Sequence, residues 1–233
     1  MIIGSGLLAS AFDPKAVEML DATIFASGVS NSNETDPASY AREERLLSEH
    51  LGSSAHRIFV YFSTCSITDP DRGAGMYARH KKRMEDKVAT LDNYLILRLP
   101  QVVGRTQNPN TLTNFLASRI AQGATIPLWS RAIRCLVDVE HVAAITLELL
   151  RQEHPIRMLA DIAPPEVVTM PSLVDMLESA MGICTERQLI DREGGSHPDP
   201  SLMLSLSPSL GLDVSRGYTE RLLRKYYGRP DAS

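Results

Sequence analysis

The sequence is poor in the residues that mark several protein classes. It has three cysteines, one tryptophan and a formal net charge of −4 over 233 residues. The cysteines are odd in number and far apart in the chain, which excludes a disulfide framework and a zinc site, so we expect no metal and three buried thiols in a reducing compartment. The slightly acidic balance argues against a nucleic-acid partner, because proteins that bind nucleic acids are usually basic.

Long apolar runs are also missing. The N-terminal stretch MIIGSGLLASAFD is short and has no Lys or Arg ahead of its apolar residues, which is atypical of a signal peptide or a membrane span. We therefore expect a cytoplasmic protein with no membrane partner. The hydrophobic fraction is 43%, and a chain of this length can bury one good-sized core with or without a small appendage.

Strand-like and helix-like segments alternate as far as Gly104. The strands expected from apolar runs lie at 1–3, at the start of 21–34, at 56–67 and at 94–104, and the helices at 10–20, 36–51 and 76–93. The strands are continuously apolar rather than alternating, which indicates a parallel sheet covered by helices on both faces. The sequence therefore predicts an α/β fold.

Beyond Gly104 the pattern is less regular. We expect helices at 108–124 and 140–152, a strand at 126–139, and a short strand, a Pro-rich loop and a helix within 156–182. The stretch 192–212 is rich in Gly, Pro and Ser and is expected to be a loop. A final helix is expected at 215–228.

The first four expected strands end in small or hydroxyl-bearing residues, namely GSG, ASGVSNS, STCS and LPQVVG. Because the carboxyl ends of parallel strands meet at one edge of a sheet, we expect a ligand cleft there. The first of these ends is GSGLLA at 4–9, which has the spacing of a phosphate-binding turn that leads into a helix. No acidic residue follows about 20 positions later to hold an adenosine ribose, since Glu18 and Asp21 come too early.

Tyr77 and Lys81 are one helical turn apart in the expected helix at 76–93. Residues i and i+4 share a helix face, and an ammonium beside a phenol favours the phenolate, which would bring the pKa of Tyr77 down towards neutrality. Thr64 ends the preceding strand, where its hydroxyl can share a substrate oxygen with the phenol or simply cap a turn. The three residues form a candidate acid–base set. His80 is expected to point away from Lys81 into solvent.

Together these features resemble the short-chain dehydrogenase/reductase superfamily, most closely its extended branch of nucleotide-sugar epimerases, dehydratases and reductases. The matching segments come in family order over most of the chain: IGSGLLASAF, IFASGVSNS, VYFSTCSI, YARHK, LRLPQVVG and IRCLVDVEHVAAITLELL. The resemblance implies a Rossmann-type doubly wound parallel sheet in a dinucleotide-binding domain at 1–150, with 105–134 contributing to the substrate side. A smaller substrate-binding part would occupy 151–233.

The resemblance also implies an NAD- or NADP-dependent reaction on a nucleotide-activated sugar, in polysaccharide biosynthesis. Tyr77 would exchange a proton with a sugar hydroxyl or ketone, Lys81 would lower the pKa of Tyr77 and hold the nicotinamide ribose, and Thr64 would orient the same oxygen. The residues implied at the cofactor are Gly4, Ser5, Gly6, Leu7, Leu8, Ala26, Ser27, Gly28, Ser63, Lys81, Pro100, Val102 and Val103. Those implied at the substrate are Ser66, Asn108 and Arg134. A homodimer through the helices at 36–51 and 77–92 is common among proteins of this resemblance.

The sequence departs from the family pattern in two places. Only residues 10–20 separate the glycine turn from the second strand, so one or two strands are expected to be absent, and the choice between NAD and NADP stays open. No Asp-Glu pair follows Thr64, which argues against a dehydratase. A trimmed adenosine site suits an exchangeable cofactor, and so a ketoreductase rather than an epimerase. Two alternatives stay open: an inactive remnant that binds a dinucleotide or a partner, and a reductase of another small carbonyl compound.

Overall fold

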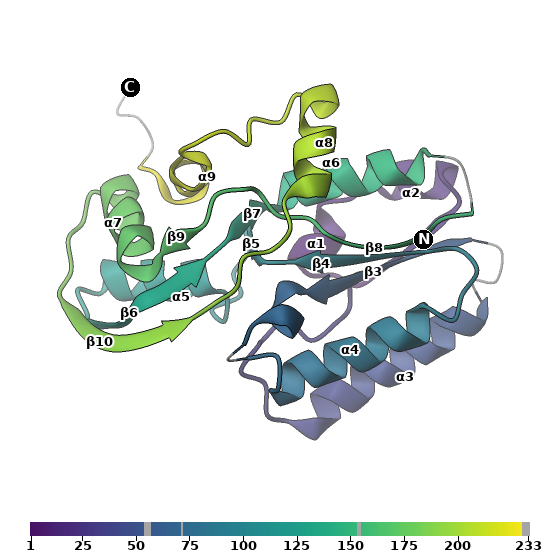
Figure 1. Cartoon of the computed structure of the whole chain (residues 1–233), viewed down its shortest axis with the longest axis horizontal. Coiled ribbons are helices and arrows are strands. Elements are labelled where there is room, and N and C mark those ends of the chain that lie inside the picture. The colour runs from purple at the N-terminus through teal and green to yellow at the C-terminus, as the bar shows by residue number, and fades with distance from the viewer. Residues whose placement is uncertain (54–56, 71, 153–154, 230–233) are drawn as a thin grey trace.

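A five-stranded parallel sheet forms the larger part of the molecule (Figure 1). The structure is a computed structural model that describes residues 1–53, 57–70, 72–152 and 155–229. The strands follow chain order across the sheet: β1 (Ile2–Ile3), β2 (Ala22–Phe25), β3 (Ile58–Thr64), β4 (Tyr94–Leu99) and β8 (Arg157–Asp161). The expected α/β class and the parallel sheet are confirmed.

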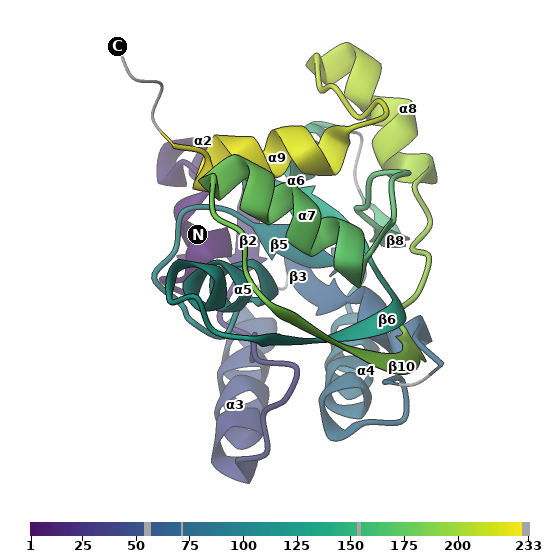
Figure 2. The same cartoon turned by 90° about the vertical axis from the view of Figure 1, so that its left-hand side faces the viewer.

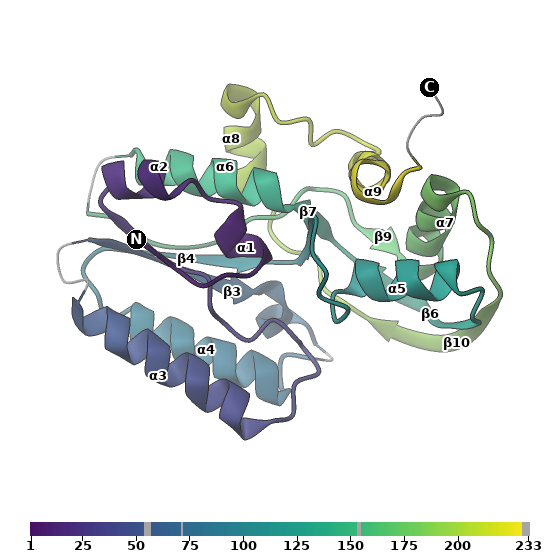
Figure 3. The same cartoon turned by 180° about the vertical axis from the view of Figure 1, so that it is seen from behind.

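Alternate side chains of the strands point into two separate cores, one on each face of the sheet. Ile24 and Val60 belong to the first core, and Phe25 and Tyr61 to the second. The helices on the first face are α1 (Leu7–Ser10), α2 (Pro14–Met19), α6 (Val139–Leu150) and α8 (Ser201–Leu210), and those on the second are α3 (Pro37–Ser53) and α4 (Met76–Val88), as Figures 1 and 3 show. Because both faces are covered, every residue of β3 is buried.

The strand β1 lies at the edge of this sheet. It pairs with β2, and no other strand of the described residues pairs with its far side. Between β1 and β2 the chain forms only α1 and α2. The expected absence of strands from the doubly wound sheet is therefore confirmed. The connections β1–β2 and β2–β3 move in the same direction across the sheet, but their helices cover opposite faces. The two connections therefore have opposite handedness. Connections between parallel strands are nearly always right-handed, so one of these two is unusual.

Proline sets a bound of two of the expected elements. The helix expected at 10–20 is shorter: Ser10 ends α1, and α2 begins only at Pro14, because Asp13 caps it by accepting a hydrogen bond from the backbone amide of Lys15 at 3.1 Å. The strand expected at 94–104 likewise ends at Pro100, which has no amide hydrogen for the ladder.

The chain then builds a second, smaller part. Beyond Pro100, β5 (Gln101–Val103) pairs with β7 (Leu136–Asp138) in a separate two-stranded sheet. The strand expected at 126–139 is thus two strands, β6 (Ile126–Arg134) and β7. The elements of the smaller part around β6 are β6 (Ile126–Arg134), β9 (Val168–Thr169), β10 (Arg187–Gly194), α5 (Leu112–Ala121), α7 (Met170–Met181) and α9 (Tyr218–Tyr227). In the three-stranded sheet, β6 lies between β10 and β9, and Figure 2 shows α7 beside α9.

The chain passes from the larger part to the smaller part and back more than once. After the excursion through β5, β6 and β7, α6 and β8 return to the parallel sheet, so the sheet crosses the expected domain boundary at residue 150. The segment 192–212, expected to be a loop, is corrected by the structure: it holds the end of β10 and α8. Met203 and Ser207 of α8 are buried, and the helix ends at Gly211 in a left-handed conformation, φ 66°. Core packing by its Leu and Met outweighs the Ser- and Pro-rich composition. The final helix expected at 215–228 is confirmed as α9.

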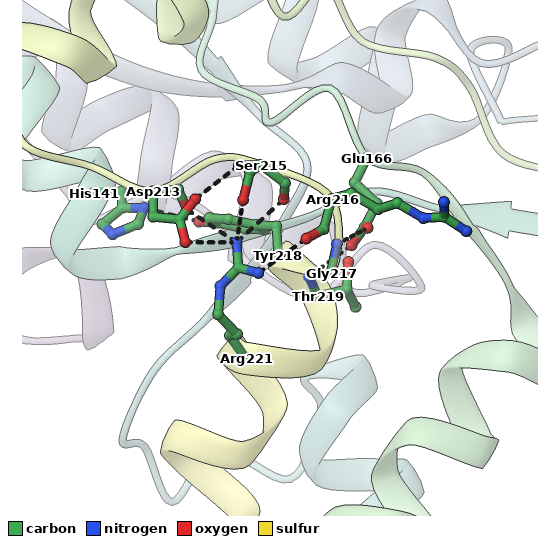
Figure 4. Close-up of polar contacts among 9 residues, drawn as sticks. All are labelled: His141, Glu166, Asp213, Ser215, Arg216, Gly217, Tyr218, Thr219 and Arg221. Atoms are coloured by element: carbon green, nitrogen blue, oxygen red, sulfur yellow. Dashed lines mark hydrogen bonds and ion pairs between the residues drawn. The ribbon is translucent and has the colours of Figure 1, made fainter.

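The start of α9 is anchored by side chains from distant segments (Figure 4). The carboxylate of Glu166 accepts hydrogen bonds from the backbone amides of Gly217 and Thr219, both at 2.7 Å. Arg221 forms an ion pair with Asp213 at 3.1 Å and donates to the loop that precedes the helix. Free amides at a helix start need such acceptors, so Glu166 fixes α9 in place.

The outward surfaces of α3 and α4 are polar. Lys82 pairs with Asp86 along α4, and Lys87 reaches Glu44 of α3 at 3.1 Å. Among the large apolar side chains found exposed in the described residues, only Met76 belongs to either helix. The dimer through these helices stays a prediction. None of the helices in the described ranges has the length and apolar content needed to cross a membrane.

Candidate active site

Three adjoining cavities open at the carboxyl ends of β1 to β4, and all three are bordered by Ser32 and Ser66. The turn cavity, beside the glycine turn at 5–8, has a volume of about 420 Å³. The arginine cavity, beside Arg134, has about 340 Å³. The tryptophan cavity, beside Trp129, has about 460 Å³. The cleft expected at this edge of the sheet is therefore present.

Most residues implied at the cofactor line the turn cavity: Ser5, Gly6, Leu7, Leu8, Ala26, Ser27, Gly28, Ser63, Lys81, Pro100 and Val102. Gly4 and Val103 do not. Gly4 has φ 132° and lies so close to β2 that a Cβ there would be 2.5 Å from the Ala26 carbonyl oxygen. Val103 is buried in the core.

The residues implied at the substrate are spread over the cleft. Ser66 borders all three cavities and Arg134 borders the arginine cavity. Asn108 borders the turn cavity instead. The structure thus brings Ser66 and Arg134 into one cavity and leaves Asn108 on the side of the glycine turn.

Thr64 and Tyr77 stand where the cavities meet. Thr64 borders the turn and arginine cavities, and Tyr77 borders the turn and tryptophan cavities. The Thr64 Oγ1 accepts a hydrogen bond from the backbone amide of Ser66 at 3.1 Å and so caps the 3-10 turn at Cys65–Thr68. Its side chain also hydrogen-bonds to Tyr77. The capping role of Thr64 is therefore present, and its sharing of a substrate oxygen with Tyr77 stays a prediction.

The pKa of Tyr77 moves in the direction opposite to the expectation. Burial raises it above its usual value, and the charge of Lys81 and the hydrogen bond from Thr64 lower it only in part. Glu43 raises it again. Lys81 acts on Tyr77 in the expected direction, but desolvation of the phenol outweighs that effect. The expected net fall is wrong.

Sequence reasoning missed Glu43, which lies on α3 and is fully buried. One of its oxygens accepts hydrogen bonds from Lys81 Nζ at 2.9 Å and from the Tyr61 hydroxyl at 2.7 Å, and the other from the backbone amide of Val29 at 2.7 Å. Burial alone would raise the pKa of Glu43, but Lys81 and these hydrogen bonds lower it to about 2. Glu43 is therefore an ionised partner for Lys81.

His80 is buried beside the same carboxylate rather than solvated. Its Nε2 lies 3.1 Å from a Glu43 oxygen, and its side chain is 2% exposed. One signal in the sequence could have found this cluster: Glu43 shares a helix stripe with Tyr40 and Leu47, which are both buried. A carboxylate on a core-facing stripe needs a buried partner.

Two guanidinium groups face the arginine cavity. Arg134 donates to the carbonyl oxygens of Ile133 at 2.6 Å and Gly194 at 3.4 Å, and Arg72 donates to Ser32 Oγ at 3.0 Å. Burial lowers the pKa of Arg134, and the charge of Arg72 lowers it further. Asp69 borders the same cavity and raises the pKa of Arg134 in part, but the two guanidinium groups outnumber it among the described side chains there, so the cavity is suited to an anion.

Two further features bear on ligand binding. The hydroxyl of Ser63, at the end of β3, is buried in the wall of the turn cavity and has no hydrogen-bond partner in the part of the chain that the structure describes. Cys65 and Cys135 are buried as expected, whereas Cys184 is exposed, which corrects that expectation. No group of metal ligands occurs among the described residues.

Solved structures match the chain over almost its whole length. The UDP-N-acetylglucosamine 4-epimerase of Methanobrevibacter ruminantium, in complex with UDP-N-acetylmuramic acid, has a TM-score of 0.69 at 15% identity, covering 97% of this chain and 81% of its own. The UDP-glucose 4-epimerase of Thermus thermophilus, in complex with NAD, has a TM-score of 0.66 at 18% identity, covering 96% and 83%. The chain has the same fold as these UDP-sugar 4-epimerases.

The likeness to this fold extends to a third protein, RMD from Pseudomonas aeruginosa complexed with NADPH. Its TM-score is 0.62 at 17% identity, covering 88% of this chain and 79% of its own. By contrast, no protein-family model and no curated protein matches the sequence. The resemblance inferred from the sequence motifs is therefore confirmed as a likeness of fold, at identities too low to fix the reaction.

Proposed function

We propose that the protein is an NAD(P)-dependent enzyme that acts on a nucleotide-activated sugar, with carbonyl reduction favoured over epimerisation. One observation carries the proposal: Thr64, Tyr77 and Lys81 border the turn cavity, and Thr64 also borders the arginine cavity. The proton donor Tyr77 thus lies in the site suited to a dinucleotide, and Thr64 beside it lies where that site meets the one suited to an anion.

The residues of the turn cavity fit the nicotinamide half of a dinucleotide. The backbone at 5–8 would hold the diphosphate, because a Cβ at Gly6 would have no heavy atom within 4 Å and the backbone is open to approach. Lys81 and the unpartnered hydroxyl of Ser63 would hold the ribose and the carboxamide end, with Pro100 and Val102 against the ring. When bound, the cofactor supplies or accepts a hydride.

The protein's own residues would donate the proton that the carbonyl oxygen takes up. With the pKa of Tyr77 raised, the phenol is protonated near neutral pH and can donate to a carbonyl oxygen. Thr64 would hold the same oxygen by a second hydrogen bond. A donor that starts in its protonated form supports reduction as the working direction.

The arginine cavity supports a substrate with a diphosphate. Arg134 and Arg72 would pair with its oxygens, since guanidinium groups bind such anions by charge-assisted hydrogen bonds. The Methanobrevibacter ruminantium epimerase was solved with a UDP-linked sugar, which is a ligand of this chemical class. A nucleotide-activated sugar would place its diphosphate at the arginines and its sugar at Thr64 and Tyr77.

Titration with NADH and NADPH, followed by nicotinamide fluorescence, tests the cofactor site. We expect saturable binding by the wild type and at least about tenfold weaker binding by Lys81→Ala, a loss of about 1.4 kcal/mol. Lys82→Ala is the matched control, because Lys82 is the next residue on α4, is exposed and pairs with Asp86. Failure of both cofactors to bind at millimolar concentration would overturn the oxidoreductase proposal in favour of an inactive remnant of the fold.

A screen of keto-sugar nucleotides with the bound cofactor tests the substrate class. Oxidation of NADH or NADPH by a 4-keto or related sugar nucleotide is the expected result, whereas interconversion of two sugar nucleotides without net oxidation would indicate an epimerase. Turnover of simple ketones alone would indicate a reductase of other small carbonyl compounds.

A further inference from the structure

We propose that Glu43 offsets the charge of Lys81 and thereby holds Tyr77 as a neutral phenol, so that the site is set to donate a proton rather than to withdraw one. The inference takes its catalytic meaning from the proposed function, but the effect is a property of the protein without ligands. Glu43 would act through Lys81, as a positioning residue rather than a catalytic one.

The contacts of Glu43 fix it in the ionised form. Its two oxygens receive hydrogen bonds from Lys81, Tyr61 and the amide of Val29, and His80 lies at 3.1 Å. A carboxyl group surrounded by donors has no acceptor nearby for a proton of its own. Lys81 therefore faces a full negative charge at 2.9 Å.

Lys81 also lies close to the phenol that it is expected to tune. Its Nζ is 6.0 Å from the centroid of the Tyr77 ring and 5.2 Å from that of Tyr61. A lone ammonium at this range would stabilise a phenolate, whereas an ammonium paired with a buried carboxylate presents little net charge to its surroundings. The lysine keeps its place in the cleft, and the carboxylate offsets part of its influence on the pKa of Tyr77.

The other titratable and charged groups around Tyr77 do not lower its pKa in place of Lys81. They are Tyr40 on α3, Tyr61 and Cys65 at β3 and its end, His80 on α4, and Glu34, Arg72 and Arg192 around the tryptophan cavity. Burial raises the pKa of Tyr40, Tyr61 and Cys65, so these three are neutral near pH 7. The charged groups of the tryptophan cavity border solvent, which screens them.

A neutral phenol suits the reduction of a carbonyl group. The carbonyl carbon receives a hydride from reduced nicotinamide, the reductant of the proposed function, and the C=O π bond opens. The oxygen takes the proton of Tyr77, whose O–H bond breaks to leave a phenolate. Oxidation of a hydroxyl runs the other way and must start from the phenolate, which stays scarce near pH 7 unless a cation lowers the pKa of the phenol.

A second buried ion pair provides a matched control. Glu85 lies on α4, is 1% exposed and holds Arg98 of β4 by two hydrogen bonds of 2.8 Å. Its removal deletes a buried carboxylate next to a cation, as the removal of Glu43 does, but Glu85 is not among the main groups that shift the pKa of Tyr77. An effect common to both variants would be structural.

The ionisation of Tyr77 is measured by NMR on the full-length protein without ligands, with 13C at the tyrosine Cζ and the Tyr77 signal assigned with Tyr77→Phe. Over a titration from about pH 6 to about pH 12, we expect Glu43→Gln to lower the pKa of Tyr77 by about 1 or more. Glu85→Gln should leave it unchanged. An unchanged or higher pKa in Glu43→Gln overturns the inference.

A second pair of variants covers the case in which Glu43→Gln does not fold. In Lys81→Met, Glu43 has lost its main counter-ion, and the pKa of Tyr77 should rise above that of the wild type. Adding Glu43→Gln to that variant removes both charges and should return the pKa close to the wild-type value. If the double variant titrates like Lys81→Met, the charge of Glu43 does not reach Tyr77 and the inference fails.

The two proposals fail separately. If the wild type binds NADH or NADPH but Tyr77 titrates alike in all variants, the cofactor site stands and the role of Glu43 does not. If the variants shift the pKa of Tyr77 as expected but neither cofactor binds, the charge effect stands and the oxidoreductase does not.

Discussion

At the scale of single residues, Gly28 packs so closely against the Glu43–Lys81 ion pair that there is no room for a side chain at this position. A Cβ at this position would lie 2.4 Å from Lys81 Nζ and 2.9 Å from Glu43 Oε1. The atoms in the way are the ends of two side chains rather than backbone, so the fold can adjust, but only by moving the lysine or the carboxylate. A glycine at position 28 is thus needed to leave space for Lys81, and not for the conformation of the backbone after β2.

We therefore expect Gly28→Ala to remain folded and to bind NADH about tenfold more weakly, as measured by fluorescence titration. Gly52→Ala is the control, because a Cβ there meets nothing within 4 Å. Gly52 lies in α3, so its replacement should stabilise the protein by about 0.5–1 kcal/mol in urea unfolding without changing the affinity. Unimpaired NADH binding by Gly28→Ala would mean that Lys81 can shift without loss of the site.

The sequence predicts the local half of the candidate site and misses the distant half. Thr64, Tyr77 and Lys81 could be found because a strand end and one helical turn place them within a few residues of one another. The helix stripe could have marked Glu43 as a buried carboxylate, but the contacts of Glu43 and Tyr61 with Lys81 could not be predicted, because they depend on how α3 and α4 pack on the sheet. The direction of the pKa shift of Tyr77 failed for the same reason: desolvation is set by packing and not by spacing.

At the scale of elements, prolines and turn residues account for most differences between expectation and structure. The expected alternation of strands and helices is present, because continuous apolar runs and amphipathic stripes record burial directly. Pro14 and Pro100 each set a bound of an element that looks longer in the sequence. The helix α8 was not predicted because Ser and Pro alternate with its apolar residues, and only contact with the first face of the sheet shows which of these are buried.

The attachment of α9 gives a testable case at this scale. Glu166 accepts two backbone hydrogen bonds at 2.7 Å, and these lower its pKa despite burial, which raises it. We expect Glu166→Gln to lower the free energy of unfolding by about 1–2 kcal/mol, measured in urea, because a charged cap is replaced by a weaker acceptor.

The control for α9 is Glu220→Gln, in the first turn of the same helix. Glu220 is paired with Arg224 at 2.8 Å, and both side chains are largely exposed. Its replacement should cost less than about 0.5 kcal/mol. Equal losses in the two variants would show that Glu166 acts only through the helix dipole and not as a cap.

At the scale of the whole molecule, the edge position of β1 decides how much of a dinucleotide the protein can enclose. The turn cavity runs from the glycine turn to Lys81, and beyond β1 no further strand of the described residues offers a wall. The sequence predicted this absence from the short segment 10–20. It could not predict that the two connections around β2 would have opposite hands, because handedness depends on which face each helix covers.

We therefore expect the adenosine half of the cofactor to contribute little to binding. Dissociation constants of NADH and of reduced nicotinamide mononucleotide, measured by the same fluorescence titration, should differ by less than about tenfold, or 1.4 kcal/mol. NADPH should bind about as well as NADH. An NADH affinity more than about a hundredfold above that of the mononucleotide would show an adenosine site that the sheet does not provide.

The shared path of the chain between the two parts has a consequence for how the protein can be cut or rebuilt. The parallel sheet is completed only by β8, after the segment that forms β5, β6 and β7. A truncation at residue 150 would remove β8 and α8 from the larger part, and β9, β10, α7 and α9 from the smaller one. Neither piece would be a complete folding unit, so new substrate specificities must be sought by exchanging loops around the cleft and not by swapping domains.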